Sequence, residues 1–213
     1  MFARALAEAI GTFFLLVAVI GSGIMAENLT QDVALALLAN ALATGAALVV
    51  LITTLGPVSG AHFNPAVSLV MLLRGELKAN ETAVYVICQI GAGLLAVIAT
   101  HFMFEQNLIQ ISSTSRTGLS QYGSEFLATF GLVFFILLGV KHNAGAVPWI
   151  VGLYITGAYW FTSSTSFANP AVTIARSFTD TFSGISPSHA PLFIVMQILG
   201  AIAAWLGANP LTR

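Results

Sequence analysis

Six long apolar segments constrain the fold of this chain more than any other feature. They lie at about residues 5–25, 33–54, 82–104, 122–141, 146–163 and 190–208. A helix needs about 20 mainly apolar residues to cross a bilayer, and each segment approaches or exceeds that length. Hydrophobic residues make up 57% of the chain and charged residues only 7%, against about 25% charged residues in a soluble domain. The sequence therefore predicts an all-α integral membrane protein with six transmembrane helices.

A short motif occurs twice between these segments. Residues 64–68 and 169–173 both read Asn-Pro-Ala-Val followed by a hydroxyl residue. Asparagine is a favoured helix N-cap, and proline fits the first helical position, where its missing N–H costs nothing. The apolar runs that follow end at about Leu73 and Phe178, too early to cross a bilayer. We therefore expect two re-entrant half-helices, each entering and leaving on one side of the membrane.

The two halves of the chain resemble each other beyond these motifs. Residues 8–13 and 125–130 both read Glu-x-x-x-Thr-Phe at the head of an apolar segment. Three segments and one half-helix form a unit, and an odd number of crossings inverts the second copy. We predict one channel domain, 1–213, made of inverted repeats 1–104 and 121–213 joined by the polar loop 105–120. Such repeats, with broken helices meeting near the midplane, indicate a permeation or binding site.

The basic residues predict the orientation. If six segments alternate, five of the Lys and Arg residues fall on one side: Arg4, Arg74, Lys78, Lys141 and Arg213. The other side keeps Arg116 and Arg176. Because the cytoplasmic side is enriched in Lys and Arg, we expect both termini and the first half-helix entrance in the cytoplasm. The simplest location is an inner or plasma membrane.

Charge and cysteine content exclude several functions. Seven basic residues against eight acidic ones argue against a nucleic-acid partner. One cysteine, Cys88, forms no internal disulfide or multi-cysteine metal site, and the four histidines show no metal-ligand spacing. We expect no metal, no cofactor and no enzyme active site. A proton-coupled transporter that uses the intramembrane carboxylates Glu8 or Glu125 is the alternative from another class.

The six segments, two half-helices and paired Asn-Pro-Ala motifs resemble the aquaporin (major intrinsic protein) family over the whole chain. The similarity includes Ala-Glu-x-x-Gly-Thr-Phe at 7–13 and Ser-Gly-Ala-His-x-Asn-Pro-Ala-Val at 59–67. It implies a homotetramer in the lipid membrane, in which each subunit has its own pore for water or small uncharged solutes. It also implies that Glu8 and Glu125 support the loops before the half-helices by accepting N–H bonds.

The resemblance places the central constriction at the paired motifs. Its residues are Asn64, Pro65, Ala66, Asn169, Pro170 and Ala171. Two half-helix N-termini aim partial positive charge at one point, and the two asparagines can offer side-chain N–H groups to a passing oxygen. Cations and protons meet a positive barrier there. The simpler alternative is that both asparagines only cap helices. His62 is expected to line the cytoplasmic half of the pore, or else to be a packed histidine without a pH role.

The expected selectivity filter departs from the family pattern. The family's arginine directly follows the second Asn-Pro-Ala, and Val172 takes that position here. Counting from the asparagines gives Thr44, Gly157 and Ser166 as the other three filter residues. These small, uncharged residues predict a widened filter that passes glycerol, urea or neutral metalloid hydroxides such as arsenite. A strict water channel is the alternative.

Arg176 lies one helical turn beyond Val172, about 6 Å further along the same face. Residues 175–178, Ala-Arg-Ser-Phe, resemble the family's own sequence at the filter arginine. Arg176 is therefore a possible positive charge at the outer mouth. The alternatives are a pair with Asp180 or a bond to loop carbonyls.

Overall fold

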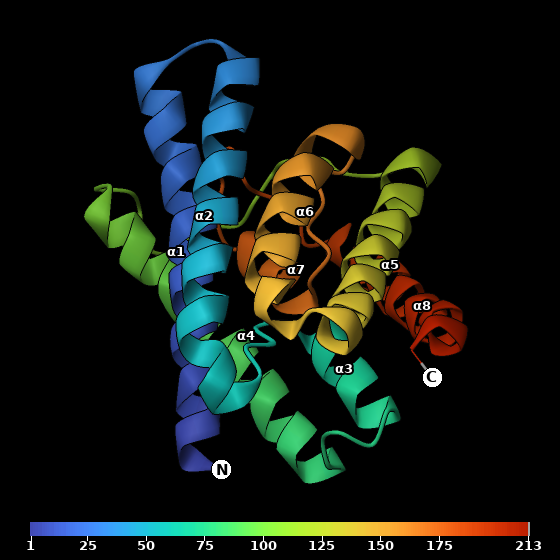
Figure 1. The fold of residues 1–213 in the computed structure, drawn as a ribbon. Helices are drawn as coiled ribbons and strands as arrows, with labels where there is room; N and C mark the ends of the chain where they lie inside the picture. Colours follow the sequence, from blue (N-terminus) through green and yellow to red (C-terminus); the bar gives the residue numbers. More distant parts are fainter. Residues whose placement is uncertain (213) are drawn as a thin grey trace.

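The structure, a computed structural model, describes residues 1–212 and contains α-helices, two short 3₁₀ helices and loops, with no strand in that range. Figure 1 shows the helices. Their bounds are α1 Phe2–Leu29, α2 Val33–Ser59, α3 Pro65–Leu73, α4 Ala79–Met103, α5 Leu119–His142, α6 Val147–Phe161, α7 Pro170–Arg176 and α8 Ala190–Ala208. The predicted all-α fold is confirmed, and the two expected half-helices are α3 and α7.

Five helices of the described chain are long and apolar enough to cross a membrane: α1, α2, α4, α5 and α8. The sixth expected span, 146–163, contains the 15-residue helix α6. At 1.5 Å per residue this helix is about 22 Å long, short of the roughly 30 Å hydrocarbon core. A 3₁₀ turn, Ala144–Ala146, extends it at its start. It ends because Thr162 is already extended, with φ −115° and ψ 139°, and leads into the loop before α7.

The helices pack in matching pairs in the two halves (Figure 1). α1 packs against α2 and α4, and α5 packs in the same way against α6 and α8. The half-helix α3 contacts α4 and α8, whereas α7 contacts α8 and α4. Each half-helix thus touches the last long helix of both halves. This is the pattern that the predicted repeats would produce, while their boundaries at 104 and 121 stay predictions.

The two halves meet closely where α2 crosses α6. A Cβ added at Gly45 would lie 2.8 Å from the carbonyl oxygen of Gly152, and one added at Gly152 would lie 2.7 Å from that of Gly45. Only glycine fits such an approach, and small residues at crossings are typical of membrane helix packing. The α2–α6 contact therefore brings the walls contributed by the two halves together.

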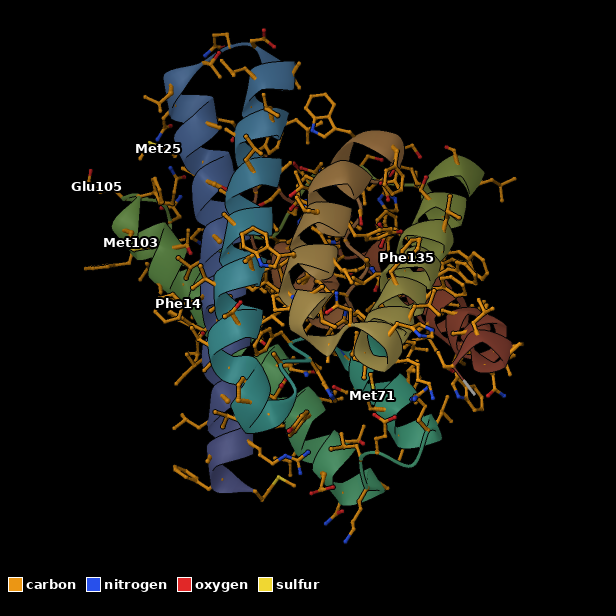
Figure 2. All side chains as sticks on the ribbon, viewed as in Figure 1. Phe14, Met25, Met71, Met103, Glu105 and Phe135 are labelled. Atoms are coloured by element: carbon orange, nitrogen blue, oxygen red, sulfur yellow. The ribbon has the colours of Figure 1, made fainter. Side chains whose placement is uncertain are left out.

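Large apolar side chains cover the outside of the bundle. Phe14, Met25, Met103 and Phe135 project from its periphery in Figure 2, and between 44% and 57% of each is exposed. A soluble protein rarely exposes so much contiguous apolar surface, whereas a bilayer accepts it. The helices and this surface define an integral membrane protein. Both chain ends lie in the lower half of the view in Figure 1.

Candidate functional site

A cavity of about 260 Å³ lies where the two half-helices meet. Its walls come from α1, α2, α5 and α6, from the half-helices α3 and α7 and from the loops before them. Most lining side chains are apolar, such as Leu48, Val67 and Leu132, and a few are polar. An apolar passage with a few placed polar groups is typical of a small-molecule site.

The two half-helices begin in the same way. Asn64 Oδ1 accepts a bond from Ala66 N at 2.9 Å, and Asn169 Oδ1 accepts from Ala171 N at 3.0 Å and Val172 N at 3.3 Å. Both asparagines are extended, with φ −155° and −158°, as N-cap residues usually are. A proline occupies the first helical position of both half-helices, because a helix start tolerates the N–H that proline lacks.

The asparagine side chains also tie the two loops together. Asn64 Nδ2 donates to the carbonyl oxygen of Ala168 at 2.8 Å, and Asn169 Nδ2 donates to that of Phe63 at 2.8 Å. Each amide nitrogen carries two hydrogens, so a second donor remains on each. Both asparagines line the cavity. The other four motif residues, Pro65, Ala66, Pro170 and Ala171, are buried but are not among the lining residues.

Glu8 is fully buried in α1 and holds the loop before α3. Its Oε1 accepts bonds from Ser59 Oγ at 2.7 Å and His62 N at 2.9 Å. Its Oε2 accepts bonds from Phe63 N at 2.6 Å and Gln89 Nε2 at 2.8 Å. A buried carboxylate is tolerable because these donors replace water.

Glu125, also fully buried, does the same for the loop before α7. It accepts bonds from Phe167 N and Ala168 N, both at 2.9 Å, and from Gln197 Nε2 at 2.6 Å. Gln197 also donates to Thr173 Oγ1, the hydroxyl after the second motif. Both carboxylates thus have the loop-supporting geometry that the family resemblance implied.

The loops need this support because their backbones are strained. Ala61 and Phe63 before α3 have φ of 50° and 49°, and Ser166 and Ala168 before α7 have φ of 51° and 49°. Non-glycine residues rarely adopt positive φ, and each such residue costs on the order of 1–3 kcal/mol. The matching positions mean that both loops fold into the same path, which brings Phe63 and Ala168 carbonyls to the opposite asparagine.

Three of the four predicted filter residues line the cavity, namely Thr44, Ser166 and Val172. Gly157 does not, and this part of the prediction needs correction. On α6 the lining residues are Val147, Val151, Ile155 and Tyr159, which follow the period of one helix face. Two residues along an α-helix turn by about 200°, so position 157 points away from the face that carries 155 and 159.

Tyr159 is therefore the α6 residue that lines the cavity beside Thr44. It is 3% exposed, and its hydroxyl lies 3.2 Å from Thr44 Oγ1 on α2. The α6 wall is an aromatic ring with a polar tip, where counting from the asparagine had predicted an open glycine. The two hydroxyls bridge α2 and α6 across one side of the cavity.

Arg176 lies at the end of α7 and lines the cavity, although it is only 2% exposed. Its Nε donates to the carbonyl oxygen of Ser183, and its guanidinium carbon lies 3.4 Å above the Phe167 ring centroid. Asp180 bonds to Ser113 instead. Of the expected roles, cavity lining and carbonyl binding both hold, and the pair with Asp180 is absent among the described residues.

The opposite end of the cavity lies at α3 and the loop after it. His62, Met71 and Glu76 line this end, and His62 Nδ1 is 3.1 Å from Ser68 Oγ. Glu76 pairs with Arg74 at 2.7 Å. His62 is thus both a wall residue and a hydrogen-bonded one.

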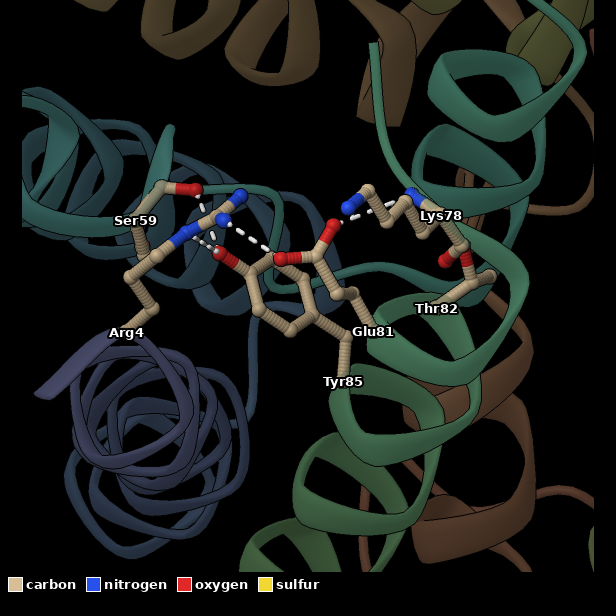
Figure 3. A network of polar contacts seen from close by, with 6 residues as sticks. All are labelled: Arg4, Ser59, Lys78, Glu81, Thr82 and Tyr85. Atoms are coloured by element: carbon tan, nitrogen blue, oxygen red, sulfur yellow. Dashed lines mark hydrogen bonds and ion pairs between the residues drawn. The ribbon is translucent and has the colours of Figure 1, made fainter. Parts of the chain in front are cut away.

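A surface network holds the loop at this end (Figure 3). Arg4 donates to Tyr85 Oη at 2.9 Å and pairs with Glu81 at 3.0 Å. Tyr85, fully buried, donates its hydroxyl to the carbonyl oxygen of Ser59 at 2.8 Å. In the second half, Arg116 Nη1 donates directly to the carbonyl of Ser164 at 3.3 Å. Each loop is therefore anchored, five residues before its asparagine, to an arginine.

These features define the class of the protein. It is an α-helical membrane channel whose cavity lies between two opposed half-helices. The chain belongs to the major intrinsic protein family, whose model matches residues 1–156. It is accordingly a passive channel for water and small uncharged solutes and not an enzyme.

Relatives of known name support this assignment. The chain is 55% identical to aquaglyceroporin AqpS of Rhizobium meliloti, over 99% of this chain and 93% of that protein. It is 29% identical to nodulin-26 of Glycine max, over 95% of this chain and 76% of that one. The fold is similar to the X-ray structure of the aquaglyceroporin from Plasmodium falciparum, with a TM-score of 0.75 at 21% identity, covering 99% and 98% of the two chains.

Sequence reasoning missed several residues of this site. Gln89 and Gln197 are isolated polar residues in apolar segments, and each precedes an isoleucine in the third segment of its half. This repetition could have paired them with the two glutamates. Tyr159 follows Val151 and Ile155 at four-residue spacing, a helical period that ungapped counting ignores. No sequence signal marked Arg116, because its partners are loop carbonyls.

Proposed function

We propose that this channel passes solutes larger than water, with glycerol, urea and neutral metalloid hydroxides such as arsenite as its substrates. The observation that carries the proposal is Val172, which lines the cavity at the position where the family pattern has an arginine. An isopropyl side chain is shorter than a guanidinium and brings no fixed charge or donor fork to that point. The 55% identical relative is named an aquaglyceroporin, which agrees with this substrate class.

The proposed filter consists of Thr44, Tyr159, Ser166 and Val172. Three of these residues carry hydroxyls that can form hydrogen bonds to a polyol or a metalloid hydroxide: Thr44, Tyr159 and Ser166. Val172 offers an apolar surface to the rest of the solute. Uncharged solutes then pass the two asparagines. One N–H of each side chain donates to the opposite loop, and the second N–H is free to donate to the solute. Half-helix N-termini at the same point disfavour cations.

A strict water channel is the second candidate, and Tyr159 is the observation that favours it. Its aromatic ring lines the wall where the sequence predicted an open glycine, and its hydroxyl lies 3.2 Å from Thr44 Oγ1. A proton-coupled transporter has less support. Glu8 and Glu125 each accept bonds from backbone N–H groups, which engage the oxygens that a proton relay would use.

We also propose a homotetramer with both termini in the cytoplasm of an inner or plasma membrane. The positive residues near the α3 end, Arg4, Arg74 and Lys78, support this orientation under the positive-inside rule. The apolar periphery in Figure 2 offers surface to lipid and to neighbouring copies.

Stopped-flow light scattering of proteoliposomes tests the proposed substrates. Vesicles with the channel should swell in gradients of glycerol, urea and arsenous acid faster than empty vesicles, with flux linear in concentration. Water flux without any of these solutes would support the strict water channel. Saturable uptake that needs a pH gradient would support the transporter.

A further inference from the structure

Two arginines at the α7 end of the cavity have no carboxylate partner. No carboxylate oxygen of a described residue lies within 4.0 Å of a guanidinium nitrogen of Arg176 or Arg116; the ion pairs of residues 1–212 are Arg4–Glu81 and Arg74–Glu76. Both guanidinium groups instead contact one ring, with their carbons 3.4 Å and 5.1 Å from the Phe167 centroid. A buried arginine is normally paired with an acid, so the charge here is unusual.

The two arginines differ in what their donors do. Arg116 uses Nε, Nη1 and Nη2 on the carbonyl oxygens of Gly184, Ser164 and Phe182. Arg176 uses Nε alone, on the carbonyl of Ser183. Its Nη1 and Nη2 groups have no hydrogen-bond partner among residues 1–212, and the side chain lines the cavity. The free edge of the Arg176 guanidinium is therefore available to something inside the cavity.

A second buried group at this end also has no partner. Ser166 is 3% exposed and lines the cavity, and its Oγ makes no hydrogen bond within the described chain. It directly precedes Phe167, the ring beneath Arg176. Buried polar atoms are nearly always bonded, so an unpartnered hydroxyl and an unpaired guanidinium that line the same cavity indicate that a polar ligand binds between them.

Glu125 does not pair with either arginine. Glu125 accepts bonds from Phe167 N, Ala168 N and Gln197 Nε2, so its oxygens are engaged behind the loop. Because neither Arg116 nor Arg176 is paired with a carboxylate of residues 1–212, the charge at this end favours an anion over a cation.

We propose that the α7 end of the pore holds a binding site for a small planar oxyanion, such as nitrate or a short carboxylate, formed by Arg176 and Ser166. A guanidinium edge presents two parallel N–H groups that match two oxygens of a planar anion. The Ser166 hydroxyl supplies a further donor. Because the site lies within the cavity, an anion there obstructs uncharged solutes. The inference rests on the proposed function only in using glycerol flux as its readout.

Nitrate inhibition of glycerol flux tests the site. In proteoliposomes the wild type should lose about half of its glycerol flux when nitrate equals its dissociation constant, and chloride, which offers one centre instead of two oxygens, should inhibit less. Arg176→Gln should raise the half-inhibiting nitrate concentration roughly tenfold or more, because a bond to a charged group is lost. Flux of each variant is compared with its own nitrate-free rate.

Arg74→Gln is the matched control, since it removes one arginine from a partly exposed pair at the other end, and it should keep wild-type inhibition. If Arg176→Gln fails to assemble, Arg176→Lys and Ser166→Ala decide the matter: each should weaken nitrate inhibition while water flux reports the fold. Wild-type glycerol flux that is insensitive to nitrate, or equal sensitivity in the Arg176 and Ser166 variants, would overturn the site. Absence of glycerol flux without nitrate would instead contradict the proposed function.

Discussion

Asn64 donates its side-chain amide to the carbonyl of Ala168, the residue directly before Asn169, at 2.8 Å. Asn169 returns the same bond to Phe63, directly before Asn64. Each asparagine therefore caps its own half-helix and fastens the opposite loop. The two halves of the chain are joined at the centre of the passage by this exchange, which fixes where the second N–H of each amide points.

We predict that Asn64→Ala and Asn169→Ala each lower the stability of the protein by about 1–3 kcal/mol. Loss of an N-cap costs about 0.5–2 kcal/mol, and the opposite carbonyl loses its donor as well. Thermal unfolding of the purified protein in detergent measures the effect. Asn143→Ala is the control, because Asn143 is exposed and its side chain caps nothing. Midpoints for the motif variants equal to that of the control would contradict the cross-bonding role.

We predict that Tyr159, and not Gly157, controls the passage of larger solutes at α6. Tyr159→Ala removes a ring from the wall and should raise glycerol flux relative to water flux. Gly157→Ala should change neither, because the added Cβ would find only Phe161 at 3.6 Å, an ordinary contact. Paired stopped-flow measurements decide this. A larger change in Gly157→Ala than in Tyr159→Ala would mean that α6 presents its other face to the pore.

We predict that Arg4 and Tyr85 act together on the loop before α3. Tyr85→Phe leaves the buried Ser59 carbonyl without its donor, which should cost about 1–3 kcal/mol. Tyr122→Phe, which removes a hydroxyl bonded to Thr117 at an exposed site, should cost within about 0.5 kcal/mol.

A double-mutant cycle of Arg4→Gln with Tyr85→Phe tests the coupling. We expect an interaction energy of at least about 0.5 kcal/mol, since residues of one network are not additive. Additive effects would show that the surface arginine and the loop are independent.

We predict a pH dependence for the loop that precedes α5. Hydrogen bonds from Ser113 N and Oγ hold the pKa of Asp180 below its usual value. The ionised form is therefore favoured in the folded state, and the stabilisation is complete above about pH 4, the usual aspartate pKa. It is lost as the pH falls through the lowered folded value.

Amide hydrogen exchange at Ser113 measures this anchor. Protection should persist at mildly acidic pH and vanish only under stronger acid, whereas Asp180→Asn should show weaker protection than the wild type wherever Asp180 is ionised. Loss of protection in the wild type already near neutral pH would contradict the anchor.

Much of the fold follows from short-range patterns in the sequence. Apolar length predicts the membrane helices, and Asn-Pro at residues 64–65 and 169–170 predicts both half-helix starts to the residue. Glu8 and Glu125 stand out because a carboxylate in an apolar segment needs donors.

Which side chains line the cavity is harder to predict, because this depends on how each helix is rotated about its own axis. Counting from Asn169 gave Gly157, yet the face of α6 that carries Val151, Ile155 and Tyr159 lines the cavity. Arg116 reaches carbonyls that come together only in the folded protein, so residue type and spacing give no sign of it.

The decisive experiment compares the glycerol-to-water permeability ratio of Val172→Arg with that of the wild type. Arginine at this position should restore a bulky charge to the filter and lower the ratio by roughly tenfold, while Val172→Leu, which adds bulk without charge, should lower it less. Water flux shows that each variant is assembled. A ratio in Val172→Arg equal to that of the wild type would contradict the account, because the residue after the second Asn-Pro-Ala would then not decide which solutes pass.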